Sequence, residues 1–155
     1  MKIQGAYDYE ILYTTFASQV ETYLDLVMIE LNGPGVQPQG PFLAFDIISP
    51  YIASNYLEDD GTKAFECVVS FTVYDKSKVK AITIADAWRS ALKTFRMRME
   101  LNAVPIVIVQ IMNTQIRSVP ETTESATMVG FDVRLRLQET FDDTDIDEIK
   151  DINLD

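Results

Sequence analysis

The strongest pattern in the chain is a strict alternation of apolar and polar side chains in two segments. In residues 128–139, every second residue from Val129 to Leu137 is apolar, and most of the residues between them are charged. Residues 65–74 alternate in the same way. A β-strand points successive side chains to opposite faces. Both segments are therefore predicted to be strands with one apolar face.

Four further segments complete the predicted secondary structure. Residues 42–52 and 104–112 are apolar at both parities, which is typical of strands that are covered on both faces. Residues 8–31 and 78–101 carry apolar residues at three- and four-residue spacing, which predicts two amphipathic helices. The buried stripe of the second helix is expected to consist of Ala81, Ala85, Trp88, Leu92, Phe95 and Met99.

The order of these segments is α-β-β-α-β-β, in which each of two hairpins is preceded by a helix. This order predicts an α+β fold, with a four-stranded, mainly antiparallel sheet and helices packed on one face. The chain has 155 residues, which is the length of one domain. We place that domain at residues 1–139 and treat residues 140–155 as an acidic C-terminal tail.

The net charge of −11 is distributed unevenly along the chain. Residues 139–155 contain eight acidic residues and one lysine, whereas seven of the thirteen basic residues lie within 76–98. Since apolar residues are interleaved with the acids, the tail is more than a solvating segment. It is either an assembly arm that docks on a neighbouring subunit or on another protein of the same assembly, or a segment that completes the core of its own subunit. Its apolar residues are Phe141, Ile146, Ile149, Ile152 and Leu154.

The composition offers few of the residue types that catalytic sites use most often. There is no histidine, so the commonest general base and metal ligand is absent. Cys67 is the only cysteine, and its place on the apolar parity of a strand predicts a buried thiol. The acidic turn "EDDG" fails the spacing of a calcium loop. We predict no catalytic residue, cofactor or metal site. No signal peptide or membrane span is apparent, so we expect no membrane partner.

The segments "PFLAFDIISPYI", "FECVVSFTVY" and "GFDVRLR" follow one another within residues 41–139. Through these motifs, residues 41–139 resemble the neck terminator, or tail terminator, proteins of tailed bacteriophages. That family shows an "F-E-x-x-V-S-F-T-x-Y" strand, matched here at 65–74, and then a helix that begins after "D-K". It also shows a closing "G-F-D-V-R-L-R" strand, matched at 130–136, while "PFLAFDIISPYI" is similar to the family's first strand. Two features depart from the pattern. "TTESATMV" replaces a charged cluster before the closing glycine, and the acidic tail after Phe141 is expected to lie outside the shared pattern.

The resemblance implies a structural virion protein without turnover, located in the tail or neck and assembled in the host cytoplasm. It implies a homohexameric ring at the head-proximal end of the tail tube, which ends tube growth and joins the tail to the head connector. The implied partners are the chain itself, the tail tube protein and a head-side connector or stopper protein. DNA passes through such a ring without sequence-specific binding.

A ring needs contacts between different surfaces of identical subunits, and arginine suits such contacts because its planar fork binds carboxylates at two points. The candidate subunit interface comprises Asp132, Arg134, Arg136, Lys78, Lys80, Arg89 and Lys93. The alternative is that these residues are ordinary solvent-facing charges. Two other functions also stay open. One is a different head–tail connector or tail tube component, and the other is a small α+β ligand-binding domain or enzyme, which predicts a pocket with convergent polar groups.

Overall fold

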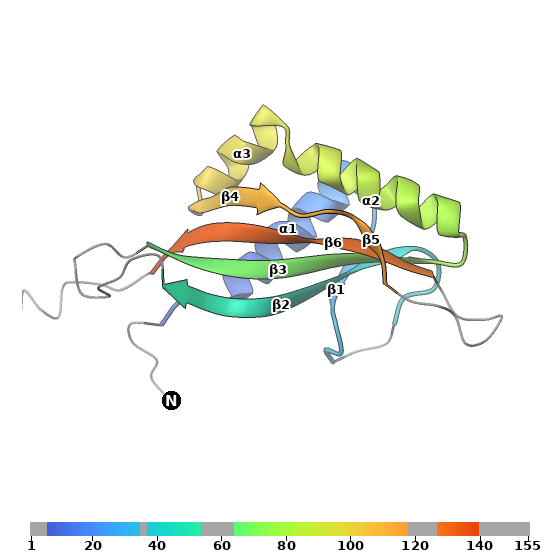
Figure 1. The fold of residues 1–155 in the computed structure, drawn as a ribbon, viewed down its shortest axis with the longest axis horizontal. Helices are drawn as coiled ribbons and strands as arrows, with labels where there is room; N and C mark the ends of the chain where they lie inside the picture. The colour runs from blue at the N-terminus through green and yellow to red at the C-terminus, as the bar shows by residue number, and fades with distance from the viewer. Residues whose placement is uncertain (1–5, 35–36, 54–63, 118–126, 140–155) are drawn as a thin grey trace, which may run out of the picture.

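The computed structural model describes residues 6–34, 37–53, 64–117 and 127–139 (Figure 1). The acidic tail and the "EDDG" turn lie outside the described residues. Over the described residues the fold is α+β, as predicted, with three helices and a six-stranded mixed sheet. In chain order the elements are α1 (Glu10–Leu24), β1 (Met28–Glu30), β2 (Phe42–Ala53), β3 (Ala64–Asp75), α2 (Lys78–Leu92), α3 (Phe95–Asn102), β4 (Ile106–Ile111), β5 (Gln115–Ile116) and β6 (Thr127–Gln138).

The sheet is built around the two strands whose alternation is strictest in the sequence. Its order is β1-β2-β3-β6-β4, and the short β5 pairs with β6. β3 pairs antiparallel with β2 and with β6, in a register that places Glu66 opposite Arg136 and Ser70 opposite Asp132. β1 runs parallel to β2. β1 and β4 are therefore the ends of the sheet order, and β3 and β6 lie inside it.

The core lies between the helices and one face of the sheet. Phe16 of α1 packs edge-on against Phe71 of β3 with ring centroids 5.1 Å apart, and Trp88 of α2 packs against the same ring at 5.4 Å. Trp88 and Cys67 are fully buried, as predicted. α2 begins where the side chain of Ser77 accepts a hydrogen bond from the Lys80 amide. Helices on one face leave the other face of the sheet without a helical cover (Figure 1).

The first predicted helix, residues 8–31, extends seven residues beyond the observed end of α1. α1 ends at Leu24, and Asp25 adopts a left-handed conformation while its amide donates to the carbonyl of Glu21. The next residues form β1, where Met28 is buried opposite Leu43 of β2. The predicted number of four strands is wrong, because β1 and the short β5 join the sheet, while the described sheet is mainly antiparallel with β1 as its one parallel strand. The apolar residues after Leu24 have the three- and four-residue spacing of a helix, but they fit a short parallel strand equally well.

The second predicted helix is two helices, and its stripe changes phase between them. Thr94 caps α3, because its hydroxyl oxygen accepts a hydrogen bond from the Met97 amide at 3.2 Å. The buried residues of α3 are Met97 and Leu101. The prediction that Phe95 and Met99 are buried is wrong, since these side chains are 76% and 60% exposed. One unwound turn is enough to rotate the following face of a helix.

The prediction of strands covered on both faces is confirmed for the first half of β2, which lies between β1 and β3. Its residues at both parities are buried: Phe42, Leu43, Ala44 and Phe45. The prediction is wrong for the second half of β2, where Ile48 and Tyr51 are exposed, and for the edge strand β4, where Val107 and Val109 are exposed. In these two parts, apolar residues at both parities mark uncovered surface. None of the described helices is long and apolar enough to cross a membrane.

Candidate functional site

The open face of the sheet carries a band of paired charges and hydroxyls, which we call the charged sheet face. It arises because the polar parities of β3 and β6 lie in register with each other. Its side chains come from β3, from β6 and from the residue after β5. They are Glu66, Ser70, Thr72, Arg117, Asp132, Arg134 and Arg136.

One half of the charged sheet face is centred on Glu66. Arg134 Nη2 lies 2.6 Å from Glu66 Oε1, and Arg134 Nε donates to the same oxygen at 2.7 Å. Arg136 Nη2 lies 3.4 Å from the other oxygen, Oε2. Glu66 is only 8% exposed, so the two guanidinium groups compensate a carboxylate that water scarcely reaches. One carboxylate between two arginines leaves this half with one net positive charge.

The other half of the charged sheet face is centred on Arg117. Its Nη2 lies 2.7 Å from Asp132 Oδ1, and its Nη1 donates to the hydroxyls of Ser70 and Thr72, the latter at 3.0 Å. Arg117 is not among the residues predicted for the interface, because it lies between the predicted strands 104–112 and 128–139. The sequence does hold a signal for it. Ser70 and Thr72 of β3 and Asp132 of β6 lie on the polar parities of their strands, and Asp132 needs a cationic partner on that face.

The predicted basic residues of the second helix lie on a separate surface. Lys78, Lys80 and Lys93 are exposed on or next to α2, with Lys80 Nζ 3.7 Å from Asp75 Oδ2. Arg89 is half-buried, donates to the backbone carbonyls of Ile111 and Met112, and sits 5.6 Å above the ring of Phe131. Arg89 therefore ties α2 to the sheet on its helix-covered side. The structure brings Asp132, Arg134 and Arg136 together, but it does not join them to the four α2 residues.

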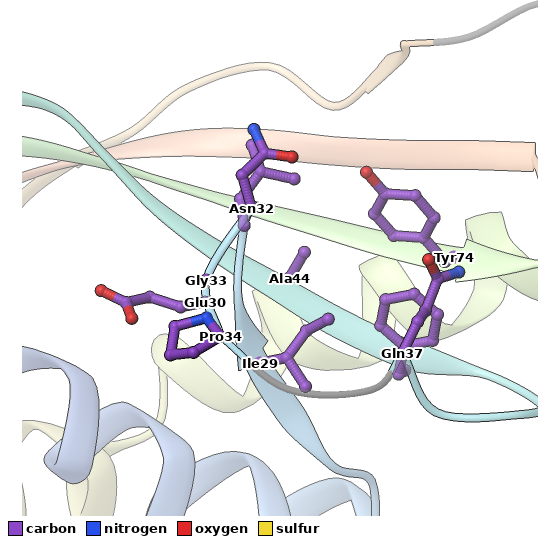
Figure 2. Close-up of a pocket in the computed structure, with 10 residues that line it drawn as sticks. Ile29, Glu30, Asn32, Gly33, Pro34, Gln37, Ala44 and Tyr74 are labelled. Carbon is purple, nitrogen blue, oxygen red and sulfur yellow. The ribbon is translucent and has the colours of Figure 1, made fainter.

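A shallow pocket of about 200 Å³ lies at the β1 end of the open face (Figure 2). Tyr74 lines it, stacked on Phe42 with ring centroids 4.7 Å apart, and burial raises the pKa of the Tyr74 hydroxyl. Figure 2 shows the Glu30 carboxylate pointing away from the Tyr74 ring, so these polar groups do not converge. Within the described parts of the chain, no cluster of three or more acidic or cysteine residues could hold a metal ion.

Cys67 is the remaining group with nucleophilic chemistry. Burial raises the pKa of its thiol to about 11, so the thiol stays protonated at neutral pH. The thiolate is the reactive form of cysteine. Cys67 therefore serves as a small core residue, in agreement with its parity in the sequence.

The described surface thus presents paired charges and exposed apolar side chains. The phage neck terminator protein family matches residues 12–155. This chain belongs to that family. A search of the curated proteins found no match. The neck terminator match runs through the acidic tail, so the expectation that the tail lies outside the shared pattern is wrong.

Family membership makes the chain a structural bacteriophage protein of the tail and neck, and implies contacts with other tail and head components. The geometry also explains one glycine of the terminator motif. Gly130 lies opposite Thr72, where a Cβ atom would come within 2.1 Å of the Phe71 carbonyl oxygen. Only glycine allows β6 to approach β3 this closely.

Proposed function

We propose that this neck terminator forms a ring at the head-proximal end of the tail tube, where it ends tube growth and joins the tail to the head connector. DNA passes through the ring without sequence-specific binding. The observation that carries the proposal is the family match over residues 12–155. Binding geometry, rather than turnover, is then the function, and assembly takes place in the host cytoplasm.

The distribution of surfaces supports a ring. A head-to-tail ring of identical subunits needs two different contact patches on each subunit. The chain offers the charged sheet face on one side of the sheet, and the basic residues Lys78, Lys80 and Lys93 on the other. We propose that Asp132, Arg134 and Arg136 contribute to one patch, and that the α2 residues contribute to the second. Arg89 supports the second patch by holding α2 in place.

The direct experiment is to measure the mass of the purified chain in solution and to image it by negative-stain electron microscopy, alone and with tail tubes. A terminator forms single closed rings and caps one end of each tube. Indefinite stacking would identify a tube component instead. A chain that stays monomeric and leaves the tubes uncapped would overturn the proposal.

The contribution of the charged sheet face is tested with Arg136→Ala. This side chain is 53% exposed and its contact with Glu66 is long, so its removal should leave the fold intact. We expect weaker ring formation, because losing one member of a charged pair in an interface commonly costs about 2–5 kcal/mol. Lys93→Ala tests the α2 patch in the same way. Lys76→Ala, at an exposed position outside both patches, is the matched control.

A further inference from the structure

An apolar groove lies between α3 and the edge strand β4, which lie side by side in Figure 1. We call it the α3–β4 groove. Its volume is about 360 Å³, and Phe95 and Met99 on its helical side are the side chains that the sequence had placed in the core. It is lined by Phe95, Arg98, Met99, Leu101, Asn102, Ile106, Val107 and Ile108. Exposed apolar side chains grouped in this way mark a site of association.

The strand side of the groove also has unused backbone groups. Among the described strands, β4 pairs only with β6, so its other edge presents unpaired amides and carbonyls. An uncovered edge strand is a template for an additional chain segment. The groove therefore offers apolar contacts and main-chain hydrogen bonds to the same occupant.

The rim of the groove is basic. Arg98 lines it and makes no ion pair within the described part of the chain. Arg96, two residues earlier, is paired with Glu100, with Arg96 Nε 2.8 Å from Glu100 Oε1. Lys93 lies exposed just before α3. A segment that combines apolar and acidic residues would match this surface in both respects.

The acidic tail has that composition. Residues 140–155 contain seven acidic residues and one lysine, together with the five interleaved apolar residues. We propose that the tail of one subunit docks in the α3–β4 groove of the neighbouring subunit. The inference rests on the proposed ring, and it names the occupant and the acceptor of one contact within it.

The tail leaves the fold close to a groove. Leu137 of β6 pairs with Ile106 of β4, which lines the groove, and the described chain ends two residues later at Glu139. The Glu139 carboxylate accepts a hydrogen bond from the Tyr51 hydroxyl of β2 at 3.1 Å. Sixteen residues span up to roughly 50 Å when extended, enough to reach an adjacent subunit. A head-to-tail ring places a neighbour beside each subunit, so the proposed ring brings a neighbour's groove within this reach.

The experiment is disulfide trapping between full-length chains. One chain carries Met99→Cys, and a second chain of different tagged mass carries Ile146→Cys, Ile149→Cys or Ile152→Cys. Mixed and mildly oxidised, at least one pair should give a cross-linked heterodimer within the ring, and Arg98→Glu in the acceptor chain should reduce its yield. The native Cys67 is buried and does not compete. Val79→Cys is the matched control, because this side chain is 73% exposed on α2, outside the groove.

Each outcome decides the inference. Interchain cross-links at Met99→Cys but not at Val79→Cys support it. A cross-link that forms within a single chain carrying both Met99→Cys and a tail cysteine, and not between chains, overturns it in favour of docking on the same subunit. Rings without any cross-link overturn the tail contact and leave the proposed function standing. If the unsubstituted chain forms no ring by solution mass, the proposed function fails as well.

Discussion

Glu66 on β3 is held by two arginines of β6, with Arg134 Nη2 2.6 Å from Oε1 and Arg136 Nη2 3.4 Å from Oε2. Replacing Glu66 with alanine removes the shared partner and leaves two guanidinium groups beside each other on the sheet. We expect Glu66→Ala to lower the free energy of unfolding by about 1–3 kcal/mol. Urea denaturation followed by circular dichroism measures this change.

The control for this change is Glu100→Ala. Glu100 is paired with Arg96 on the exposed side of α3, where water screens the two charges, so its replacement should lower the free energy of unfolding less than that of Glu66. An equal loss for the two variants would mean that the Glu66 cluster is an ordinary surface contact.

Trp88 is fully buried between α2 and the sheet, in contact with Phe16 and Phe71. Trp88→Ala should lower the free energy of unfolding by about 3–5 kcal/mol, because it leaves a cavity at the centre of the core. The native protein should also show the blue-shifted tryptophan fluorescence of a buried indole. Val79→Ala at an exposed position of the same helix should change stability by less than about 0.5 kcal/mol.

Gly130 allows the close approach of β6 to β3. Gly130→Ala places a Cβ atom within 2.1 Å of the Phe71 carbonyl oxygen, so the strands must separate. Overpacking of this kind costs about 1–3 kcal/mol, and thermal unfolding should show the loss. A variant with an unchanged melting temperature would show that the strands are not held this closely.

Stability should fall at alkaline pH. Burial raises the pKa of Cys67 from 9.0 to about 11. Burial is also the main reason why the pKa of Tyr7 rises from 10.0 to about 12, and the negative charge of a nearby Cys67 thiolate is the second. The folded state therefore binds more protons than the unfolded state between pH 9 and 12, and the free energy of unfolding decreases as pH rises through that window. At about 1.4 kcal/mol per pH unit for one proton, the thiol contributes on the order of 3 kcal/mol.

Urea titrations between pH 8 and 11 test this prediction. In Cys67→Ala, the decrease should begin nearer pH 10, because only the tyrosines whose pKa burial raises, Tyr7, Tyr9 and Tyr74, remain. A slope that is identical in both proteins would exclude the thiol as its source.

The elements that local periodicity describes well were predicted from the sequence. The alternation at 65–74 and 128–139 determined two strands and the face that each turns to the core. It also placed Asp132, Arg134 and Arg136 on one surface, as the structure confirms. The burial of Trp88 followed from its place in a helical stripe. These properties depend on side chains within a few residues of each other, so the sequence alone contains them.

Only the tertiary structure decided which partners these elements meet. The parallel pairing of β1, the edge position of β4 and the ion pair of Arg117 with Asp132 each depend on segments that are distant in the chain. The break at Thr94 turned Phe95 and Met99 from predicted core residues into the wall of the α3–β4 groove. A three- or four-residue spacing predicts a helix, but where the helix is interrupted, the residues after the break can turn a different face to the core. What lies opposite an apolar side chain is fixed by packing and register, which a linear pattern does not specify.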